Sequence, residues 1–351
     1  MIDNKIIKEI LSLHFDADSG TPYWLDQEKF LGLDAKKEIR CTQDFHLLGP
    51  MDINALRSRP LTDFIPRSLL HKLPEMILSE TGGTTGPPCR RVFTKDEFYN
   101  AFISAWLKAV EKHSFPKKGN WLFVGPGGPH IIAHSAREMA RSIGSLEPFS
   151  VDCDVRWFRK QEPDSLGFTL YLDHVLDQAV NIISTHQINT IFTTPILLSA
   201  LGERMTSEQR QCIQGIHTGG MAQDAELTAR LKEIYSNAVI LPGYGNSLFG
   251  VIFERNAAIP GEDSVFFIED PPLWLQLVPL TSTPGVDVDL KIVQPPLQQG
   301  RVVLHRLDPS FLIINLVERD GACYATGSNC RGLMHVRPLQ QLLPQDNQGV
   351  Y

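Results

Sequence analysis

The residues best suited to chemistry in this chain are the glycines and threonines of one short segment. Thr81-Gly82-Gly83-Thr84-Thr85-Gly86-Pro87-Pro88 combines hydroxyls with backbone N–H groups and little side-chain bulk. Glycine lets a backbone approach a ligand closely and adopt positive φ, and successive N–H groups can surround an anion. Arg90 and Arg91 follow and add positive charge. The segment therefore predicts a loop that grips phosphate; an ordinary Gly/Thr surface turn is the alternative.

This loop differs from the P-loop of nucleotide hydrolases. That motif ends in Gly-Lys-Ser/Thr, whereas the present loop ends in Gly86-Pro87-Pro88. Residues 90–93 are expected to form a short extended run. Thr94-Lys95-Asp96-Glu97 then has the pattern of a capping box, which predicts the start of a helix. The loop is therefore expected to lead through an extended run into a helix.

Three further glycine-rich segments follow predicted strands. They are Gly125-Pro126-Gly127-Gly128-Pro129-His130, Thr218-Gly219-Gly220-Met221 and Pro242-Gly243-Tyr244-Gly245-Asn246-Ser247. Each of them alone is typical of an ordinary turn. In open α/β sheets, however, ligands bind outside the carboxyl ends of the strands. Together with the loop at 81–88, the three segments therefore predict one shared ligand cleft.

A metal site is the first alternative chemistry. His130, His134 and Glu138 have the spacing i, i+4 and i+8, which would align them on one face of a helix and suit zinc. The HExxH pattern is absent, because Ile131 stands where its glutamate would be. A polar helix face, or a His130 that lines an organic-ligand pocket, is the favoured interpretation. No residue is therefore assigned to a metal.

Nucleophile motifs are weak in this sequence. Gly245-Asn246-Ser247-Leu248-Phe249-Gly250 has one residue too many for the GxSxG motif of serine hydrolases. Cys323 and Cys330 could be reactive thiols, but unpaired cysteines of a cytosolic protein are more often packing residues. None of these side chains is expected to act as a nucleophile.

Regular elements must position the loops. Apolar residues recur at helical spacing in the segments 97–113, 131–143, 172–183, 195–205 and 223–236. Apolar runs typical of strands lie between them, at 121–124, 151–158, 190–194, 213–217 and 238–241. This alternation predicts stacked βα units and a largely parallel sheet. After Phe249, short runs between Pro/Gly turns predict an antiparallel region, at 265–268, 273–277, 288–293, 302–305 and 311–317.

Composition narrows the class of protein. The chain has 351 residues, of which 42% are hydrophobic and 21% charged, as in ordinary globular proteins. A formal net charge of −7 disfavours a dedicated nucleic-acid binder. Six cysteines without CxxC pairs fit a reducing compartment. The N-terminus has no signal-peptide core, and no apolar stretch reaches membrane-spanning length. We expect a cytoplasmic protein with no membrane or nucleic-acid partner.

At this point the motifs resemble a known family. The loop at 81–88 resembles the Ser/Thr/Gly phosphate loop of the adenylate-forming superfamily: acyl-CoA synthetases, luciferase and peptide-synthetase adenylation domains. Gly243-Tyr244-Gly245-Asn246-Ser247 resembles that superfamily's Tyr-Gly-x-Thr-Glu segment. Tyr23-Trp24 and Leu56-Arg57-Ser58-Arg59-Pro60-Leu61 resemble the phenylacetate-CoA ligase branch. The resemblance extends, in order, over roughly residues 10 to 340.

The resemblance implies a fold. It is the α/β fold of the large N-terminal domain of adenylate-forming enzymes, with βα-layered subdomains, parallel sheets and a smaller, mainly antiparallel β subdomain. We expect α/β subdomains over 1–250, the β subdomain over 251–340 and a tail over 341–351. The family's mobile C-terminal domain, which supplies a lysine for adenylation, is expected to be absent. The segment 332–338 is expected to be a remnant of the hinge that precedes it.

The resemblance also implies a reaction and a set of site residues. A carboxylate attacks the α-phosphorus of ATP, giving an acyl-adenylate and pyrophosphate. The implied catalytic residues are Thr84, Arg90 and Ser247. The implied ATP-binding residues are Thr81, Gly82, Gly83, Thr84, Thr85, Gly86, Gly219, Gly220, Met221, Tyr244, Gly245, Asn246, Ser247 and, by a loose match, Asp320. The implied residues of the acid pocket are Gly125, His130, Thr194, Gly219 and Tyr244.

Two positions depart from the family pattern. Cys89 stands where the loop normally ends in lysine, although Arg90 follows and could substitute electrostatically. Leu248 replaces the glutamate that holds Mg²⁺. The Mg²⁺ that accompanies ATP must then be held by phosphates, waters or another carboxylate such as Glu254.

The expected function is the activation of a small aromatic carboxylic acid. The acceptor of the acyl group would be an amine, such as an amino acid, or a thiol, such as that of a carrier protein. Short members of the family include acyl-protein synthetases and an enzyme that activates griseoluteic acid in phenazine antibiotic biosynthesis, and the resemblance favours the phenazine setting. The alternative is a degenerate, non-catalytic member that binds a nucleotide or acyl ligand as a partner or carrier. A homodimer is left open.

Overall fold

The computed structural model describes residues 2–83, 86–128, 130–158, 160–255, 264–280, 288–329 and 331–339. The chain divides into two compact units, which do not follow the order of the sequence. Unit 1 consists of Met1–Thr81, Gly86–Ala101 and Phe267–Leu343, and unit 2 of Gly82–Thr85, Phe102–Phe266 and Pro344–Tyr351. The N-terminal quarter of the chain thus belongs with the C-terminal strands. The expected boundaries at residues 250 and 340 stay predictions.

The α-helices are α1 (Asn4–His14), α2 (Pro22–Leu31), α3 (Ala35–Glu38), α4 (Ile53–Ser58), α5 (Lys95–Phe98), α6 (Ala105–Lys112), α7 (Ile131–Ser142), α8 (Val155–Phe158), α9 (Leu166–Thr185), α10 (Pro195–Arg204), α11 (Ser207–Cys212) and α12 (Ala225–Ile234). Three 3₁₀ segments are η1 (Thr42–Leu48), η2 (Leu61–Phe64) and η3 (Arg67–Glu75), and η4 (Tyr99–Ser104) is π-helical. The strands are β1 (Ile77–Glu80), β2 (Arg90–Phe93), β3 (Asn120–Gly125), β4 (Phe149–Asp152), β5 (Ile188–Thr193), β6 (Gly215–Thr218), β7 (Val239–Asn246), β8 (Gly250–Glu254), β9 (Phe266–Phe267), β10 (Leu273–Pro279), β11 (Gln299–Leu307), β12 (Leu312–Tyr324) and β13 (Gly332–Pro338).

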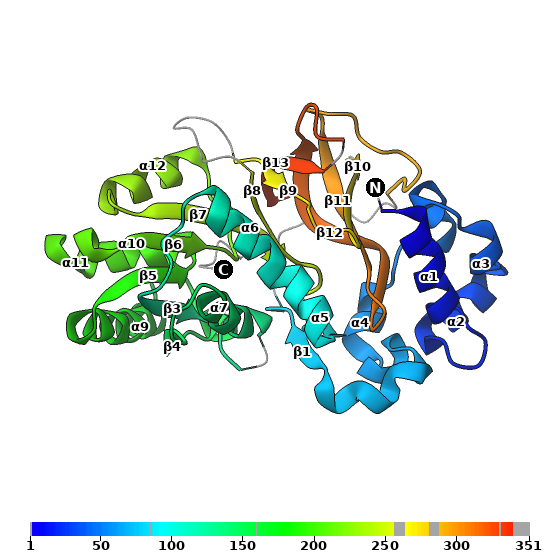
Figure 1. The fold of residues 1–351 in the computed structure, drawn as a ribbon, viewed down its shortest axis with the longest axis horizontal. Helices are drawn as coiled ribbons and strands as arrows, with labels where there is room; N and C mark the ends of the chain where they lie inside the picture. Colours follow the sequence, from blue (N-terminus) through cyan, green and yellow to red (C-terminus); the bar gives the residue numbers. More distant parts are fainter. Residues whose placement is uncertain are drawn as a thin grey trace. The chain divides into compact units, whose positions relative to one another are not determined.

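Unit 2 contains the predicted parallel sheet (Figure 1). Its strands lie in the order β8-β7-β6-β5-β3-β4; β4, β3, β5, β6 and β7 are parallel, and β8 returns antiparallel to β7. The register pairs Thr193 with Thr218, and Thr218 with Pro242. The carboxyl ends of these strands therefore meet at one edge of the sheet, where α/β proteins place their ligands.

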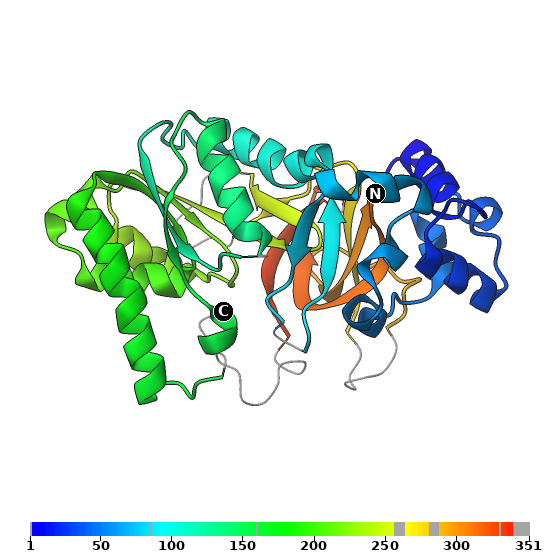
Figure 2. The same cartoon turned by 90° about the horizontal axis from the view of Figure 1, so that it is seen from below.

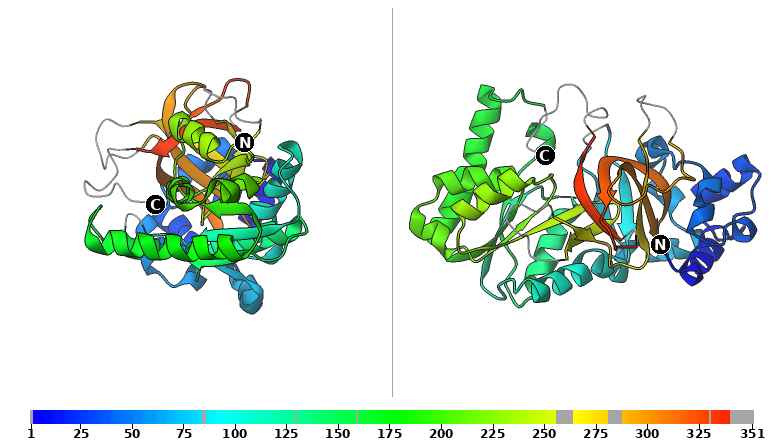
Figure 3. Two further views of the ribbon diagram at one scale, coloured as in Figure 1. Left: turned by 90° about the vertical axis from the view of Figure 1, so that its left-hand side faces the viewer. Right: turned by 90° about the horizontal axis from the view of Figure 1, so that it is seen from above.

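Alternating side chains cover the two faces of this sheet. Leu122 and Val124 of β3 pack on one side with residues of α9, α10 and α12. Trp121 points to the other side, where its ring lies 5.7 Å from the ring of Trp106 on α6. The period-2 pattern of β3 thus accounts for helices on both faces, and Figures 2 and 3 show the long helix α9 in unit 2 from other directions.

Unit 1 is built on antiparallel strands in the order β10-β11-β12-β13-β9, with β1 and β2 as a separate two-stranded sheet. The N-terminal helices pack against β11 and β12, and the indole N–H of Trp24 donates to the carbonyl oxygen of Leu312 at 3.1 Å. Arg91 of β2 is fully buried and pairs with Asp308 at 2.7 Å; Asp308 also accepts from Arg306 at 2.6 Å. This buried ion network fixes β2 to the core of unit 1.

The structure corrects three predicted elements. The helix expected over 97–113 contains the π-helical segment η4, between α5 and α6. The strand expected over 151–158 ends at Asp152, and α8 follows because the side chain of Asp154 accepts the N–H groups of Arg156 and Trp157. The segment 288–293 forms no strand; Ile292 and Val293 are exposed, so this apolar run covers no core. The segment 332–338 forms the strand β13, paired with β12, and its expected role as a hinge remnant stays a prediction.

Across the ranges described above, no helix combines the length and the apolar character needed to span a lipid bilayer.

Candidate functional site

The predicted ligand edge of unit 2 is held together by side-chain and backbone bonds. The hydroxyl of Thr193, at the end of β5, donates to the carbonyl oxygen of Val124 at 2.8 Å. The N–H of Gly219, just beyond β6, donates to the carbonyl oxygen of Thr193 at 3.3 Å. The ends of β3, β5 and β6 therefore lie side by side. Of the predicted acid-pocket residues, Gly125 and Gly219 belong to this edge.

Gly219 has room for a side chain, whereas the nearby Gly243 does not. A Cβ atom added to Gly219 would lie 3.9 Å from its nearest neighbours, the carbonyl oxygen of Gly243 and the ring of Phe192. A Cβ on Gly243 would lie 2.8 Å from His217 Cε1, so the fold itself requires that glycine. The fold would accept alanine at position 219. Because Gly219 has no side chain, a ligand can approach its backbone closely.

Tyr244 lies near the end of β7, in the tight hairpin that β7 forms with β8. Gly245 is required there, because a Cβ atom would lie 2.2 Å from the carbonyl oxygen of Gly250. The ring of Tyr244 is partly exposed and lies 5.5 Å from the ring of Phe249 and 6.1 Å from that of Phe266. The hairpin thus presents an aromatic ring at the same edge of the sheet as Gly219; the predicted role of Tyr244 toward a ligand stays a prediction.

Asn246 ends β7, and Ser247 begins the turn of this hairpin. The side-chain oxygen of Asn246 accepts the N–H groups of Leu248 at 2.8 Å and Phe249 at 3.1 Å. These two hydrogen bonds hold the turn closed, so the side chain of Asn246 stabilises the conformation of the hairpin. Ser247 is partly exposed at the tip, in agreement with a side chain that can reach a ligand.

The residues around Leu248 do not fit a metal held by the protein. Leu248 is only 4% exposed and apolar. Glu254, the expected substitute, lies at the far end of β8, four residues or roughly 13 Å from Gly250. Its carboxylate accepts from the hydroxyl of Ser264, and burial raises its pKa to about 7. Within the described part of the chain, no three His, Cys, Asp or Glu side chains gather to hold a metal ion.

The other residues predicted in unit 2 have separate places. Thr194 is buried, and its hydroxyl caps α10 by accepting the N–H of Leu197 at 3.4 Å. His130 precedes α7 and is partly exposed, while Gly220 and Met221 follow Gly219. Burial lowers the pKa of His134 on α7.

The predicted phosphate loop is closed at its base by Thr81 and Cys89. The N–H of Thr81 donates to the carbonyl oxygen of Cys89 at 3.0 Å, and the N–H of Cys89 donates to the hydroxyl of Thr81 at 2.9 Å. The strands β1 and β2, on either side, pair Glu80 with Arg90. Gly83 and Gly86 adopt positive φ, of 66° and 149°. Thr84 and Thr85, two of the predicted phosphate contacts, lie outside the described residues.

Two consecutive arginines at the start of β2, Arg90 and Arg91, point in opposite directions. Arg91 points into the core, as described above, whereas the side chain of Arg90 is 49% exposed. The Nε of Arg90 donates to Glu80 at 2.7 Å across the strand pair, and Glu80 is buried. Arg90, predicted as catalytic, is thus directed outward, and part of its charge is balanced by Glu80.

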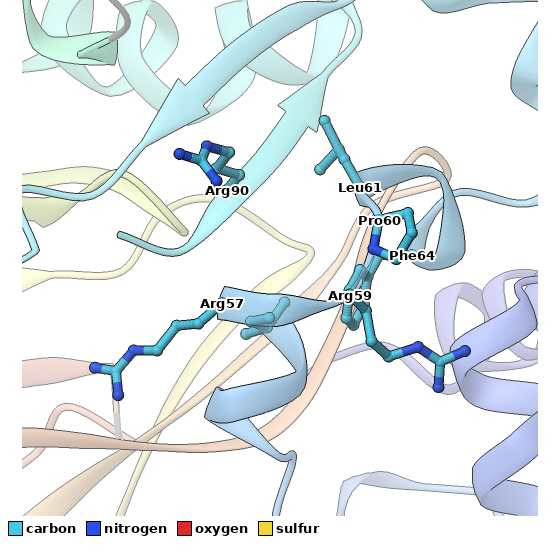
Figure 4. Close-up of a pocket in the computed structure, with 7 residues that line it drawn as sticks. Arg57, Arg59, Pro60, Leu61, Phe64 and Arg90 are labelled. Carbon is cyan, nitrogen blue, oxygen red and sulfur yellow. The ribbon is translucent and has the colours of Figure 1, made fainter. Parts of the chain in front are cut away.

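Arg57 was not assigned a role by the sequence. It lines a pocket of about 270 Å³ in unit 1, together with Arg90 and apolar residues that include Leu61 and Phe64 (Figure 4). The guanidinium groups of Arg57 and Arg59 extend to opposite sides of this pocket (Figure 4). The guanidinium of Arg57 lies next to Gly86 of the loop. The two residues are 29 positions apart in the sequence, and no local sequence pattern predicts this contact.

Asp320, the loosely matched ribose contact, lies on β12 opposite Pro338 of β13. Its carboxylate is partly buried and lies 3.9 Å from the Nε of Arg319. Its role toward ribose stays a prediction, as does the expectation that the phosphate loop and Tyr244 share one cleft.

Comparison with solved structures identifies the fold. A crystal structure of 2-hydroxyisobutyryl-CoA ligase, in complex with 2-HIB-AMP and CoA, matches 94% of this chain with a TM-score of 0.66 and 14% identity. The chain spans 65% of that ligase. McyG A-PCP complexed with phenylalanyl-adenylate matches 75% of the chain and 47% of its own length, with 13% identity and a TM-score of 0.48. A benzoate CoA ligase from Burkholderia xenovorans LB400 matches 71% of the chain and 47% of its own length, with 13% identity and a TM-score of 0.43.

The sequence itself matches no family model and no curated protein. At 14% identity, the match to the 2-hydroxyisobutyryl-CoA ligase shows the fold alone. The predicted fold class is confirmed: the chain has the fold of the large N-terminal domain of adenylate-forming enzymes.

Proposed function

We propose that this protein uses ATP to activate a small aromatic carboxylic acid as an acyl-adenylate. A carboxylate oxygen attacks the α-phosphorus, the bond from that phosphorus to the oxygen bridging to the β-phosphate breaks, and pyrophosphate leaves. An amine or thiol acceptor then attacks the acyl carbon, and AMP leaves. The sequence motifs support this reaction, and the shared fold is compatible with it.

The open backbone at Gly219 is the observation that carries the proposal. The fold would accept a side chain there, since the nearest described atoms beyond the adjoining residues lie 3.9 Å from the Cβ position, yet the chain has glycine. Close approach of a ligand explains this choice, whereas packing does not. Gly219 follows β6 on the edge where parallel sheets bind ligands. The partly exposed Tyr244 lies near the end of β7 on the same edge, and its ring supplies a surface on which adenine can stack.

In this proposal the chain holds the phosphates by backbone N–H groups and arginine, and the ATP-bound Mg²⁺ is held by phosphates and water. Leu248 is buried and apolar, and the described residues contain no group of three His, Cys, Asp or Glu side chains that could hold the ion, so no step is assigned to a protein-bound metal. Preorganised donors of this kind stabilise the negative charge that develops on the departing pyrophosphate.

The setting follows from the resemblance. We propose a phenazine-type aromatic acid as substrate in antibiotic biosynthesis in the cytoplasm, with an amino acid or a carrier-protein thiol as acceptor. Incubation with MgATP and single acids, followed by a pyrophosphate assay, tests this proposal. The panel contains a phenazine carboxylic acid, benzoate, phenylacetate and 2-hydroxyisobutyrate. Release that requires an aromatic acid supports the proposal, and release with the aliphatic acid alone contradicts the aromatic pocket.

A second candidate is a non-catalytic protein that binds a nucleotide or an acyl ligand as a carrier or partner. The buried Leu248 favours it, because the family's metal-binding glutamate has no counterpart there. The hydroxyl of Thr81 is also engaged in closing its own loop. Calorimetric binding of AMP or acid, without release of pyrophosphate from ATP with any acid of the panel, would select this second function.

A further inference from the structure

A cation from a distant part of the chain lies against the phosphate loop. Arg57 is carried by α4, whereas Gly86 belongs to the loop. A Cβ atom on Gly86 would lie 3.3 Å from both Cζ and Nη1 of Arg57, and 3.6 Å from Nη2. These nearly equal distances place the guanidinium next to Gly86, on the side where a side chain would stand.

Arg57 also contacts the residue that replaces the family's lysine. Its guanidinium is within hydrogen-bonding reach of the Cys89 thiol, which is buried. Burial raises the pKa of this thiol, and the charge of Arg57 opposes that rise. The negative charge of Glu318 on β12 adds to the rise in the pKa of this thiol. Arg57 therefore bridges the end of the glycine loop and the position at which a lysine is missing.

The neighbouring arginines are committed elsewhere in unit 1. Arg90 pairs with Glu80 at 2.7 Å. Arg59 points away from the loop and pairs with Asp26 and Asp63, each at 2.8 Å. Of the three arginines that line the pocket, Arg57 is the one whose guanidinium lies against Gly86.

We propose that Arg57 supplies the positive charge of the phosphate loop in place of the missing lysine, and binds the β- and γ-phosphates of ATP beside Gly86. The inference rests on the proposed function. A guanidinium forms two parallel charge-assisted hydrogen bonds to phosphate, which suits a loop that ends in cysteine. Arg57 would bind the β- and γ-phosphates, which AMP lacks, so Arg57 should contribute little to the affinity for AMP.

The experiment measures binding of MgATP, inorganic tripolyphosphate and AMP to the whole chain by calorimetry. Arg57→Gln should weaken MgATP and tripolyphosphate about 10- to 100-fold, because hydrogen bonds between charged groups are lost. AMP binding should change less than about threefold. Adding Cys89→Lys to this variant restores the family's lysine and should recover most of the lost affinity. Arg67→Gln, an exposed arginine of η3, removes the same charge and should leave all three affinities unchanged.

The outcomes separate the two claims. Wild-type protein that binds neither MgATP nor AMP contradicts the proposed function. Wild-type binding that Arg57→Gln leaves intact contradicts the role of Arg57 alone, as does an equal loss for AMP and MgATP. Should Arg57→Gln fail to fold, Arg57→Lys serves instead. It keeps the charge but loses the planar pair of donors, and should weaken MgATP about threefold and AMP not at all.

Discussion

Replacing Glu254 by glutamine should stabilise the protein at alkaline pH. The carboxyl group lies on β8 of unit 2 and is only 3% exposed. Burial raises its pKa from an ordinary 4.5 to about 7, against the smaller opposing effect of the Lys232 charge. The folded protein therefore disfavours the charged form. Glutamine has the shape of the protonated acid and carries no charge, so it removes this penalty.

The sign and size of the effect follow from linkage. Between pH 4.5 and 7 the folded state binds more protons at this site than the unfolded state, so stability falls as pH rises. A rise in pKa from 4.5 to about 7 corresponds to about 3 kcal/mol at pH 8, and to almost nothing at pH 4.5. Burial lowers the pKa of His14 and His217 to about 4, so these groups destabilise the fold on acidification below pH 6.5. The difference between variant and wild type cancels their contribution.

The assay is urea-induced unfolding of both proteins at pH 5.0 and pH 8.0. The variant should exceed the wild type by roughly 2–3 kcal/mol at pH 8.0 and by under 1 kcal/mol at pH 5.0. Glu111→Gln, at a side chain that is 72% exposed, is the matched control and should show no such difference. A gain of the same size at both pH values would refute the reasoning. A loss of stability at pH 8.0 would indicate a charged Glu254 with a stabilising partner.

Substitutions at four further positions test the site and its support. Gly219→Ala should leave the unfolding midpoint unchanged and weaken acid or ATP binding several-fold by calorimetry, and unchanged ligand binding would contradict the role of the open backbone. Gly245→Ala should lose about 1–3 kcal/mol of stability, because the added Cβ atom would lie 2.2 Å from the carbonyl oxygen of Gly250. Tyr244→Ala should weaken AMP binding about 5- to 100-fold if adenine stacks on the ring, and Tyr244→Phe should not; an equal loss in both would point to the hydroxyl. Asp308→Asn leaves two buried arginines short of countercharge and should cost about 3–5 kcal/mol in chemical denaturation, so a change under 1 kcal/mol would contradict the importance of this network.

The sequence predicted the parallel sheet and its loops because their signals are local. Trp121 and Leu122 alternate between the two faces of β3, and glycine-rich turns follow β3 and β6; the third glycine-rich segment, at 242–246, instead continues β7. The capping box at Thr94 forms with both of its bonds, from the N–H of Thr94 to Glu97 at 2.7 Å and from the N–H of Glu97 to Thr94 at 3.2 Å. Such features depend on neighbours in the sequence, so they can be read from it.

The errors arose where runs with apolar residues were taken for strands. Val155, Trp157 and Phe158 were predicted to continue a strand, but the capping side chain of Asp154 starts a helix there. That signal was present in the sequence. Ile292 and Val293 are apolar and exposed, and nothing local distinguishes them from a core strand. The contact of Arg57 with Gly86 depends on the tertiary packing of α4, so the sequence could not reveal it.

The central claim is that a carboxylate attacks the α-phosphorus of ATP. An aromatic acid labelled with ¹⁸O in both carboxyl oxygens, incubated with MgATP and the protein and then treated with hydroxylamine, tests it directly. The account predicts AMP that carries one ¹⁸O atom, because the bond between acyl carbon and bridging oxygen breaks in the second step. AMP without the label, or no AMP at all from a folded protein that binds ATP, would contradict it.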